Sequence, residues 1–269
     1  MKDGTVRHIT SADNPQFRSL LKLHQSSRER RKAGLSLLDG VHLVAAYLEH
    51  IGAPEQVAVG RSALDKPEIA SLLRSPLMPE PLVLTDALAR ELSTVSTPTG
   101  LIAAVKTPKA IAMGAEPGPC VILEDIQDPG NLGSILRSAA AAGVEEIYLS
   151  ARCVQAWSPR VLRAGMGAHF ALRIHEDVDV LGLVQAYPGQ VLAAASDGAT
   201  LVYDADLAGR VALLFGNEGS GLTPAMRSAA TGSISIPMPG KGESLNVAAA
   251  AAVCLFERVR QQVQQVIGR

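Results

Sequence analysis

The stretch CVILEDIQDPGNLGSILRSA, residues 120–139, decides the fold class of the second part of this chain. It begins with an apolar run typical of a buried strand, passes through a turn, and continues with the spacing of a helix. Similar apolar strands are predicted at 146–150, 171–175, 190–196, 210–216 and 232–238. They alternate with predicted helices at 158–167, 177–187, 222–230 and 244–266. This alternation predicts an α/β domain with a buried parallel sheet.

The helix predicted over residues 131–142 carries the first chemical signal. Gly133 and Arg137 are four residues apart and share one face of the helix. Asn131 is expected to cap the helix. An arginine one to two turns into a helix, at the carboxyl edge of a strand, is well placed to meet an anion or a hydroxyl. By itself the loop is equally explained by a surface arginine.

Two further loops follow apolar strands. The first, LLFGNEGSGLTP at 213–224, has three glycines that allow backbone N–H groups to approach a ligand, but it matches neither GxGxxG nor a P-loop. Its Glu218 disfavours a polyphosphate and suits a polar or cationic ligand. The second, ISIPMPGKGESLNVAAAAAVCLFE at 234–257, ends in an alanine-rich run that indicates close packing against another helix or a subunit.

The first third of the chain predicts a smaller α/β unit. One helix is expected to start at Asn14-Pro15 and run toward Arg31. Strands at 35–40, 56–60, 81–85 and 100–106 alternate with helices at 41–51, 67–74 and 86–92. Residues 107–119 hold three prolines and two glycines and are the best linker in the chain. The expected domains are therefore 1–106 and 120–269.

The formal net charge of -1 conceals a polarised chain. Residues 1–32 carry eight basic and three acidic side chains, whereas the rest carries 17 basic and 23 acidic ones. A solvated helix face and contact with nucleic-acid phosphates both explain this cluster. The predicted RNA-binding residues are Arg18, Lys22, Arg28, Arg30, Arg31 and Lys32. Because only 3% of residues are aromatic, recognition through phosphates and shape is favoured over base stacking.

Other features set the expected surroundings. The three cysteines are far apart and form no CxxC pair, which favours a reducing cytoplasm. The six histidines show no metal-ligand spacing, so no metal is expected. The N-terminus has charges where a signal peptide needs an apolar stretch, and the longest apolar run is too short to span a bilayer. We therefore expect a cytoplasmic protein without a membrane segment.

Together the three loops resemble the motifs of the SpoU/TrmH family of RNA ribose 2′-O-methyltransferases, in the SPOUT superfamily. They stand in the family's order as NLGSILR (131–137), FGNEGSG (215–221) and IPMPGKGESLN (236–246). The match runs across residues 120–260. Segments 9–23 and 35–48 also resemble the family's N-terminal substrate-binding domain. The resemblance implies a deep C-terminal trefoil knot in the catalytic domain, a homodimer, and S-adenosylmethionine as the methyl donor.

The resemblance also assigns site residues. The implied catalytic residues are Arg137, Asn131, Glu218, Ser244 and Asn246. The implied cofactor-binding residues are Ala195, Leu214, Gly216, Ile236, Met238, Leu245 and Asn246.

The implied reaction moves a methyl group to a ribose 2′-OH, which is a poor nucleophile until a partner takes or stabilises its proton. The family account gives this role to Arg137. A free guanidinium has a pKa above about 12, and neutralising one near pH 7 costs roughly 7 kcal/mol. Two roles are therefore open for Arg137: it acts as a general base, or it acts as a charged hydrogen-bond donor.

Large-subunit (23S) rRNA is the favoured substrate, because an N-terminal domain precedes the catalytic one. A tRNA substrate is the first alternative. The second is a non-catalytic RNA-binding or ribosome-assembly protein, which the five catalytic-type residues argue against. A nucleotide-dependent oxidoreductase is disfavoured because the GxGxxG turn is missing.

Overall fold

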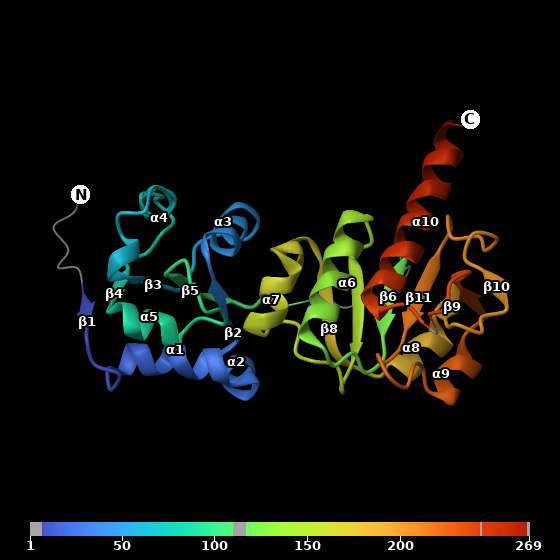
Figure 1. Cartoon of the computed structure of the whole chain (residues 1–269), viewed down its shortest axis with the longest axis horizontal. Coiled ribbons are helices and arrows are strands. Elements are labelled where there is room, and N and C mark those ends of the chain that lie inside the picture. Colours follow the sequence, from blue (N-terminus) through green and yellow to red (C-terminus); the bar gives the residue numbers. More distant parts are fainter. Residues whose placement is uncertain (1–6, 110–116, 243, 268–269) are drawn as a thin grey trace. The chain divides into compact units, whose positions relative to one another are not determined.

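The computed structural model describes residues 7–109, 117–242 and 244–267, and the chain divides into two compact units (Figure 1). Unit 1 comprises Met1–Pro108 and Trp157–Phe170, and unit 2 comprises Lys109–Ala156 and Ala171–Arg269. The division along the chain falls inside the predicted linker, most of which (110–116) lies outside the described residues. One segment differs from the domain prediction. Residues 157–170, expected in the catalytic domain, pack with unit 1.

Unit 1 contains a five-stranded sheet in the order β1-β4-β3-β5-β2. The bounds are β1 (His8–Ile9), β2 (Leu35–Asp39), β3 (Gln56–Gly60), β4 (Leu82–Leu84) and β5 (Leu101–Lys106). Strands β1, β4 and β3 run parallel, whereas β5 is antiparallel to both β3 and β2. The inward side chains form a core with the apolar face of the first helix, including Phe17 and Leu20.

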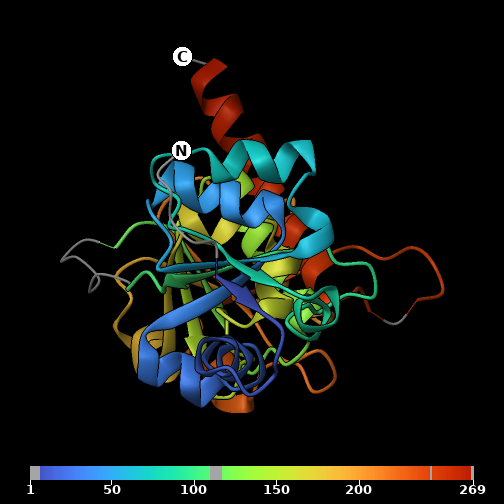
Figure 2. The ribbon, with the colours of Figure 1, turned by 90° about the vertical axis from the view of Figure 1, so that its left-hand side faces the viewer.

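Helices cover both faces of this sheet. They are α1 (Pro15–Gln25), α2 (Ser27–Ala33), α3 (Val41–His50), α4 (Pro67–Leu73), α5 (Asp86–Glu91) and α7 (Pro159–Gly165), with 3₁₀ turns η1 (Arg61–Ala63) and η2 (Ala168–Ala171). Figures 1 and 2 both show α1 and α2 on one face and α3 with α4 on the other. Helix α7 packs against β2, and its apolar side chains Val161 and Leu162 are buried there.

The single N-terminal helix expected from Asn14-Pro15 toward Arg31 is wrong in one respect, because it is broken at Ser26. That residue has extended backbone angles, and its hydroxyl accepts from the Glu29 N–H to cap α2. Asn14 caps α1 as the sequence indicates, through the backbone N–H groups of Gln16 and Phe17. A serine that can cap a new helix competes with continuing the old one. The basic residues are therefore split between two helices.

Unit 2 is a seven-stranded sheet in the order β10-β12-β9-β11-β6-β7-β8, and all of its strand pairs are parallel. The bounds are β6 (Cys120–Leu123), β7 (Glu146–Ser150), β8 (Arg173–Val178), β9 (Gln190–Ala194), β10 (Thr200–Leu201), β11 (Val211–Phe215) and β12 (Gly232–Ser235). The chain runs from β6 outward to β7 and β8, but from β11 outward in the other direction to β12. The crevice between β6 and β11 is thus the switch point where α/β proteins bind ligands.

The helices of unit 2 in the described residues are α6 (Pro129–Ala141), α8 (Val180–Ala186), α9 (Pro224–Ala229) and α10 (Val247–Ile267). Residues of α8 and α9, among them Val184 and Met226, pack on one face of the sheet. Helix α10, which carries the alanine-rich run, packs against α6 and β11 of the same unit. Among the described residues, no helix is long and apolar enough to cross a membrane.

Candidate active site

Three loops meet at the carboxyl edge of the unit 2 sheet, because all three follow parallel strands. They join β6 to α6, β11 to α9, and β12 to α10. Strand β12 ends at Ser235, three residues before the predicted end of that strand at Met238, which lengthens the third loop. Figure 2 shows part of this loop standing out from the rest of unit 2. The three sequence motifs, at 131–137, 215–221 and 236–246, are thereby neighbours although the first is far from the other two in the chain.

Helix α6 begins earlier than its sequence suggests, and this corrects the expectation that Asn131 is its cap. The helix starts at Pro129, and Asp128 caps it by accepting from the Asn131 N–H (2.8 Å). Proline is favoured at the first helical position because its missing N–H needs no partner there. The Asn131 side chain is therefore not used for capping and is available for other contacts.

A hydrogen-bonded chain of three side chains joins the three motifs. Asn131 Nδ2 donates to Glu218 Oε1 (3.1 Å), and Asn246 Nδ2 donates to Asn131 Oδ1 (2.8 Å). The Oδ1 atom of Asn246 also accepts from the Ala248 and Ala249 N–H groups and so caps α10. Asn131 is thus held in one orientation by an acceptor on one side and a donor on the other.

Glu218 is the centre of this arrangement. Its carboxylate also accepts from the backbone N–H groups of Asp128 (3.0 Å) and Gln127 (3.3 Å). Partial burial acts to raise the pKa of Glu218, but hydrogen bonds from Asn131 and from these backbone groups outweigh it. The pKa is therefore lowered, and the site holds a fixed negative charge at neutral pH.

The lowered pKa predicts acid sensitivity at this residue. The unfolded chain takes up the Glu218 proton near pH 4.3, whereas the folded protein does so only at lower pH. The stabilisation is complete above about pH 5 and is lost as the pH falls through the folded pKa. We expect the difference in melting temperature between the wild type and Glu218→Gln to shrink between about pH 5 and pH 3. A difference that stays constant over this range, measured by circular dichroism, contradicts the prediction.

Two consecutive carboxylates at the end of β6 fasten the loops in place. Glu124 accepts from both the N–H and the hydroxyl of Thr223 (2.8 Å each), where α9 begins. Asp125 has a positive φ of 60° and is held by Ser150 and by an ion pair with Arg152. Its burial acts to raise its pKa, but these two partners outweigh it, and the pKa of Asp125 is lowered.

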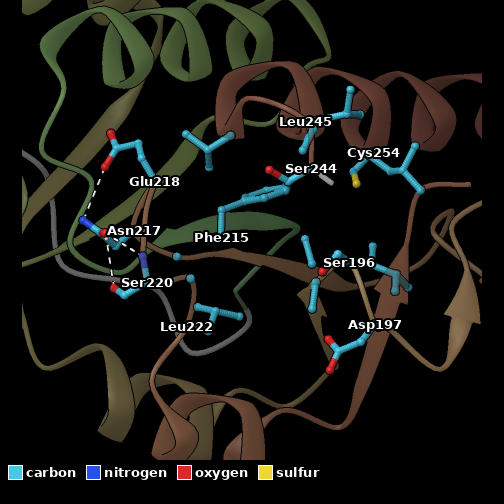
Figure 3. Close-up of a pocket in the computed structure, with 18 of the residues that line it drawn as sticks. Ser196, Asp197, Phe215, Asn217, Glu218, Ser220, Leu222, Ser244, Leu245 and Cys254 are labelled. Atoms are coloured by element: carbon cyan, nitrogen blue, oxygen red, sulfur yellow. Dashed lines mark hydrogen bonds between the residues drawn. The ribbon is translucent and has the colours of Figure 1, made fainter. Parts of the chain in front are cut away.

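The loop after β11 is shaped by Asn217. Its Oδ1 accepts from the N–H groups of Gly219 and Ser220, and its Nδ2 donates to the Asp125 carbonyl (2.9 Å). Figure 3 shows Asn217 bonded to both Glu218 and Ser220. At Gly216 the loop closes so tightly that a Cβ atom would lie 2.3 Å from the Gly221 carbonyl carbon. Gly216 is thus required for close backbone approach.

A cavity of about 340 Å³ opens between the segments that follow β9, β11 and β12 and the first turns of α10. Figure 3 shows Glu218 and Asn217 at one side, Ser244 and Leu245 above, and Asp197 at the other end. The lining of the cavity includes apolar side chains of four segments: Leu222, Ile234, Ile236, Met238, Leu245 and Val247. The size and the mixture of apolar walls with a few polar groups are typical of small-molecule sites.

Most of the predicted site residues gather around this cavity. The lining includes Ala195, Gly216, Glu218, Ile236, Met238, Ser244 and Leu245. Leu214 does not line it and is fully buried in the core of β11. Asn246 contacts Asn131 rather than the cavity. Arg137 is exposed on α6 and lies outside the lining, so its catalytic role stays a prediction.

The sequence reasoning missed two charged residues at the cavity rim. Asp197 and Arg227 both line the cavity and form a bidentate ion pair, with both Asp197 oxygens 2.8 Å from Arg227 Nη2. A signal was present, because Ser196 ends the predicted strand 190–196 and Asp197 and Gly198 follow it, at the same sheet edge as the motifs. Among the described residues, no group of three His, Cys, Asp or Glu is arranged to hold a metal ion.

The predicted RNA-binding residues lie on α1 and α2 of unit 1, and one of them is misplaced. Arg30 is only 5% exposed, and its Nη1 donates to the carbonyls of Leu23 (2.7 Å) and His24 (3.2 Å) at the end of α1. It therefore holds the two helices together, and its burial argues against contact with RNA. The other five residues are exposed: Arg18, Lys22, Arg28, Arg31 and Lys32.

The comparisons with known proteins decide the family. The model of the SpoU rRNA methylase family matches residues 118–256, which is more than half of the chain. The chain belongs to the SpoU rRNA methylase family. The chain is 34% identical to a tRNA/rRNA methyltransferase of Synechocystis, across 96% of this chain and 95% of that protein.

Two other proteins similar to this chain have more specific names. It is 28% identical to the 23S rRNA (guanosine(2553)-2′-O)-methyltransferase of Bacillus subtilis, across 93% of this chain and 98% of that protein. Among solved structures, the SpoU methyltransferase AviRb of Streptomyces viridochromogenes with its cofactor AdoMet (S-adenosylmethionine) has a TM-score of 0.84. Sequence identity there is 28%, across 93% of this chain and 98% of that one.

Proposed function

We propose that this protein transfers a methyl group from S-adenosylmethionine to a ribose 2′-OH of large-subunit (23S) rRNA. The hydrogen-bonded chain from Glu218 through Asn131 to Asn246 carries the proposal. It brings polar side chains of all three motifs together beside a cavity at the carboxyl edge of a parallel sheet. The names of the family and of its relatives, which act on 23S rRNA, support the substrate class.

The cavity fits S-adenosylmethionine in size and in chemistry. When bound, this cofactor supplies a methyl group on a positively charged sulfur. The ionised carboxylate of Glu218 suits a cationic ligand, and the apolar walls suit an adenine ring. Backbone edges at Ala195 and Gly216 line the cavity and can hydrogen-bond a base. A relative solved with AdoMet supports this assignment.

We assign Arg137 the role of a charged donor rather than a general base. Neutralising a guanidinium near pH 7 costs roughly 7 kcal/mol, whereas a charged donor can stabilise the negative charge that develops on the 2′ oxygen. Asn131, held by Glu218 and Asn246, and Ser244 would orient the ribose beside it. The reaction is an in-line displacement, so accurate positioning contributes strongly to the rate.

The exposed basic residues of α1 and α2 are proposed to hold RNA phosphates. Each phosphate contact contributes about 0.7 to the slope of log K against log salt for a single strand. Replacing Arg28, Arg31 and Lys32 by alanine should therefore flatten this slope by roughly 2. Filter binding of a 23S rRNA transcript at several salt concentrations measures it. Arg74→Ala, at the end of α4 on the opposite face of the unit 1 sheet, is the control. An unchanged slope assigns the cluster to a solvated face.

The homodimer and the knot are part of the same proposal. Exposed apolar side chains on α10, at Phe256, Val263, Val266 and Ile267, support a second copy packing against this helix. Sedimentation equilibrium should give twice the mass of one chain.

The path from β12 at the outer part of the sheet back to α10 against the central β11 supports a trefoil knot. A crystal structure traced through residues 236–246 checks the threading.

One experiment separates the proposed function from its alternatives. The protein is incubated with tritiated S-adenosylmethionine and either rRNA or tRNA from a strain that lacks it. Label in 23S rRNA, followed by mapping of the new 2′-O-methyl position, is the expected result. Label in tRNA alone would show that the substrate is tRNA and not 23S rRNA. A protein that binds rRNA but transfers no label would be the non-catalytic assembly factor.

A further inference from the structure

Unit 1 contains a second cavity, of about 430 Å³, that the proposed reaction does not use. It lies at the amino ends of β3 and β4, beside α1. Its floor is apolar, with Leu23, Leu35, Leu82 and Ala104, and two prolines at 79 and 81 form part of its wall. Its lining also includes six polar or charged side chains: Arg7, Gln16, Ser19, Glu55, Gln56 and Glu80.

The polar side chains of this cavity are poorly satisfied by the protein itself. Glu55 pairs with Lys106 (3.1 Å). Within the described part of the chain, no hydrogen bond or ion pair is found for the side chains of Arg7, Gln16, Gln56 or Glu80. The two glutamine amides each offer donors and an acceptor, the guanidinium offers only donors, and the carboxylate offers only acceptors. This mixed set matches the edge of a nucleobase.

The charge inside the cavity indicates which part of an RNA would enter it. Glu55 and Glu80 offset the positive charges of Arg7 and of Lys106, which pairs with Glu55, so the cavity has no excess positive charge for a phosphate and suits a neutral group. Outside, Lys22 follows Ser19 by one helical turn on α1, and Arg18, which pairs with Asp13, directly precedes Ser19. Both are exposed. A strand lying along α1 would place its phosphates at these cations while one base turns into the cavity.

We propose that this cavity binds one unstacked nucleobase of the RNA substrate. The apolar floor and the prolines would cover the faces of the base, while Gln16 and Gln56 hydrogen-bond its edge. Proteins that recognise RNA by sequence bind unstacked, single-stranded bases and hydrogen-bond their edges. The proposal rests on the proposed function for its ligand, and it adds a contact that selects sequence, whereas the phosphate contacts of α1 and α2 select only charge.

The test compares base contact with phosphate contact on one unmodified 23S rRNA transcript. In the double variant Gln16→Leu, Gln56→Leu, we expect about tenfold weaker binding with an unchanged salt slope, because no cation is lost. Lys22→Ala should instead reduce the slope by roughly 0.7. The matched control is Gln25→Leu, an exposed glutamine at the end of the same helix that does not line the cavity. Equal affinity of the double variant and this control overturns the proposal.

A second variant guards against a folding defect. Ser19 is exposed at the cavity wall, so Ser19→Trp should fold normally and fill the opening. It should weaken RNA binding as the double variant does, with the melting temperature unchanged.

Nuclear magnetic resonance titration with nucleoside monophosphates tests a free nucleotide as the occupant. Saturation there, with unchanged RNA affinity in both variants, overturns the proposal. A failure of the wild type to methylate the transcript would refute the proposed function without affecting these binding comparisons.

Discussion

Replacing Arg137 by alanine is expected to lower methyl transfer by about 10²–10³-fold, the range seen when one preorganised donor is removed from a transition state. Arg137 lies outside the lining of the cofactor cavity and is exposed on α6. The affinity for S-adenosylmethionine should therefore remain within about twofold of the wild type. Single-turnover transfer to rRNA measures the first quantity, and isothermal titration calorimetry measures the second.

A lysine at the same position separates charge from geometry. Arg137→Lys keeps the positive charge but loses the planar fork of donors, so we expect it to recover only part of the rate. Thermal unfolding of both variants should match the wild type, because the side chain is at the surface. Loss of cofactor binding in Arg137→Ala would remove the residue from the catalytic role and place it in the cofactor site.

Replacing Gly216 by alanine is expected to weaken cofactor binding by roughly 10- to 100-fold, which corresponds to an overpacking cost of about 1–3 kcal/mol. A Cβ atom there would lie 2.3 Å from the carbonyl carbon of Gly221 and 2.4 Å from the nitrogen of Leu222. These are backbone atoms that cannot rotate away. The loop that carries Glu218 must then move, and the cavity wall moves with it.

Gly209 provides the matched control for this substitution. It precedes β11, the strand that Gly216 follows, and a Cβ atom built on Gly209 meets nothing within 4 Å. Gly209→Ala should therefore bind S-adenosylmethionine as the wild type does, while Gly216→Ala does not. Calorimetry on both variants gives the comparison. Equal affinities would mean that the loop relaxes without disturbing the cavity.

The helix that carries Arg137 shows how much of its position and capping the sequence could predict. Apolar periodicity located it, and the residues of its motif were correctly expected at a sheet edge. Its first residue was misjudged, because Asn131 and Asp128 are both good caps by type. Asp128 is the cap, and Asn131 instead bonds to Glu218 and Asn246. Which of two capping residues is used depends on where the rest of the fold places other partners.

Arg30 and the segment 157–170 show the same limit in unit 1. Arg30 belongs to a run of basic residues that the sequence assigns uniformly to RNA, yet its guanidinium satisfies carbonyls at the end of α1. The segment follows a strand of unit 2 in the chain but packs with unit 1. Charge and periodicity are properties of neighbouring residues, whereas burial depends on which distant element covers a given face.

The sequence by itself determined the alternation of strands and helices, the polarised charge and the three motif loops, because each is encoded within a few neighbouring residues. The tertiary structure alone decided that Glu218 meets Asn131 across 87 positions and that Asn131 meets Asn246 across 115. It also decided that Asp197 and Arg227 share the cavity rim. Such contacts form only when parallel strands bring their carboxyl ends to one edge, and no local pattern specifies them.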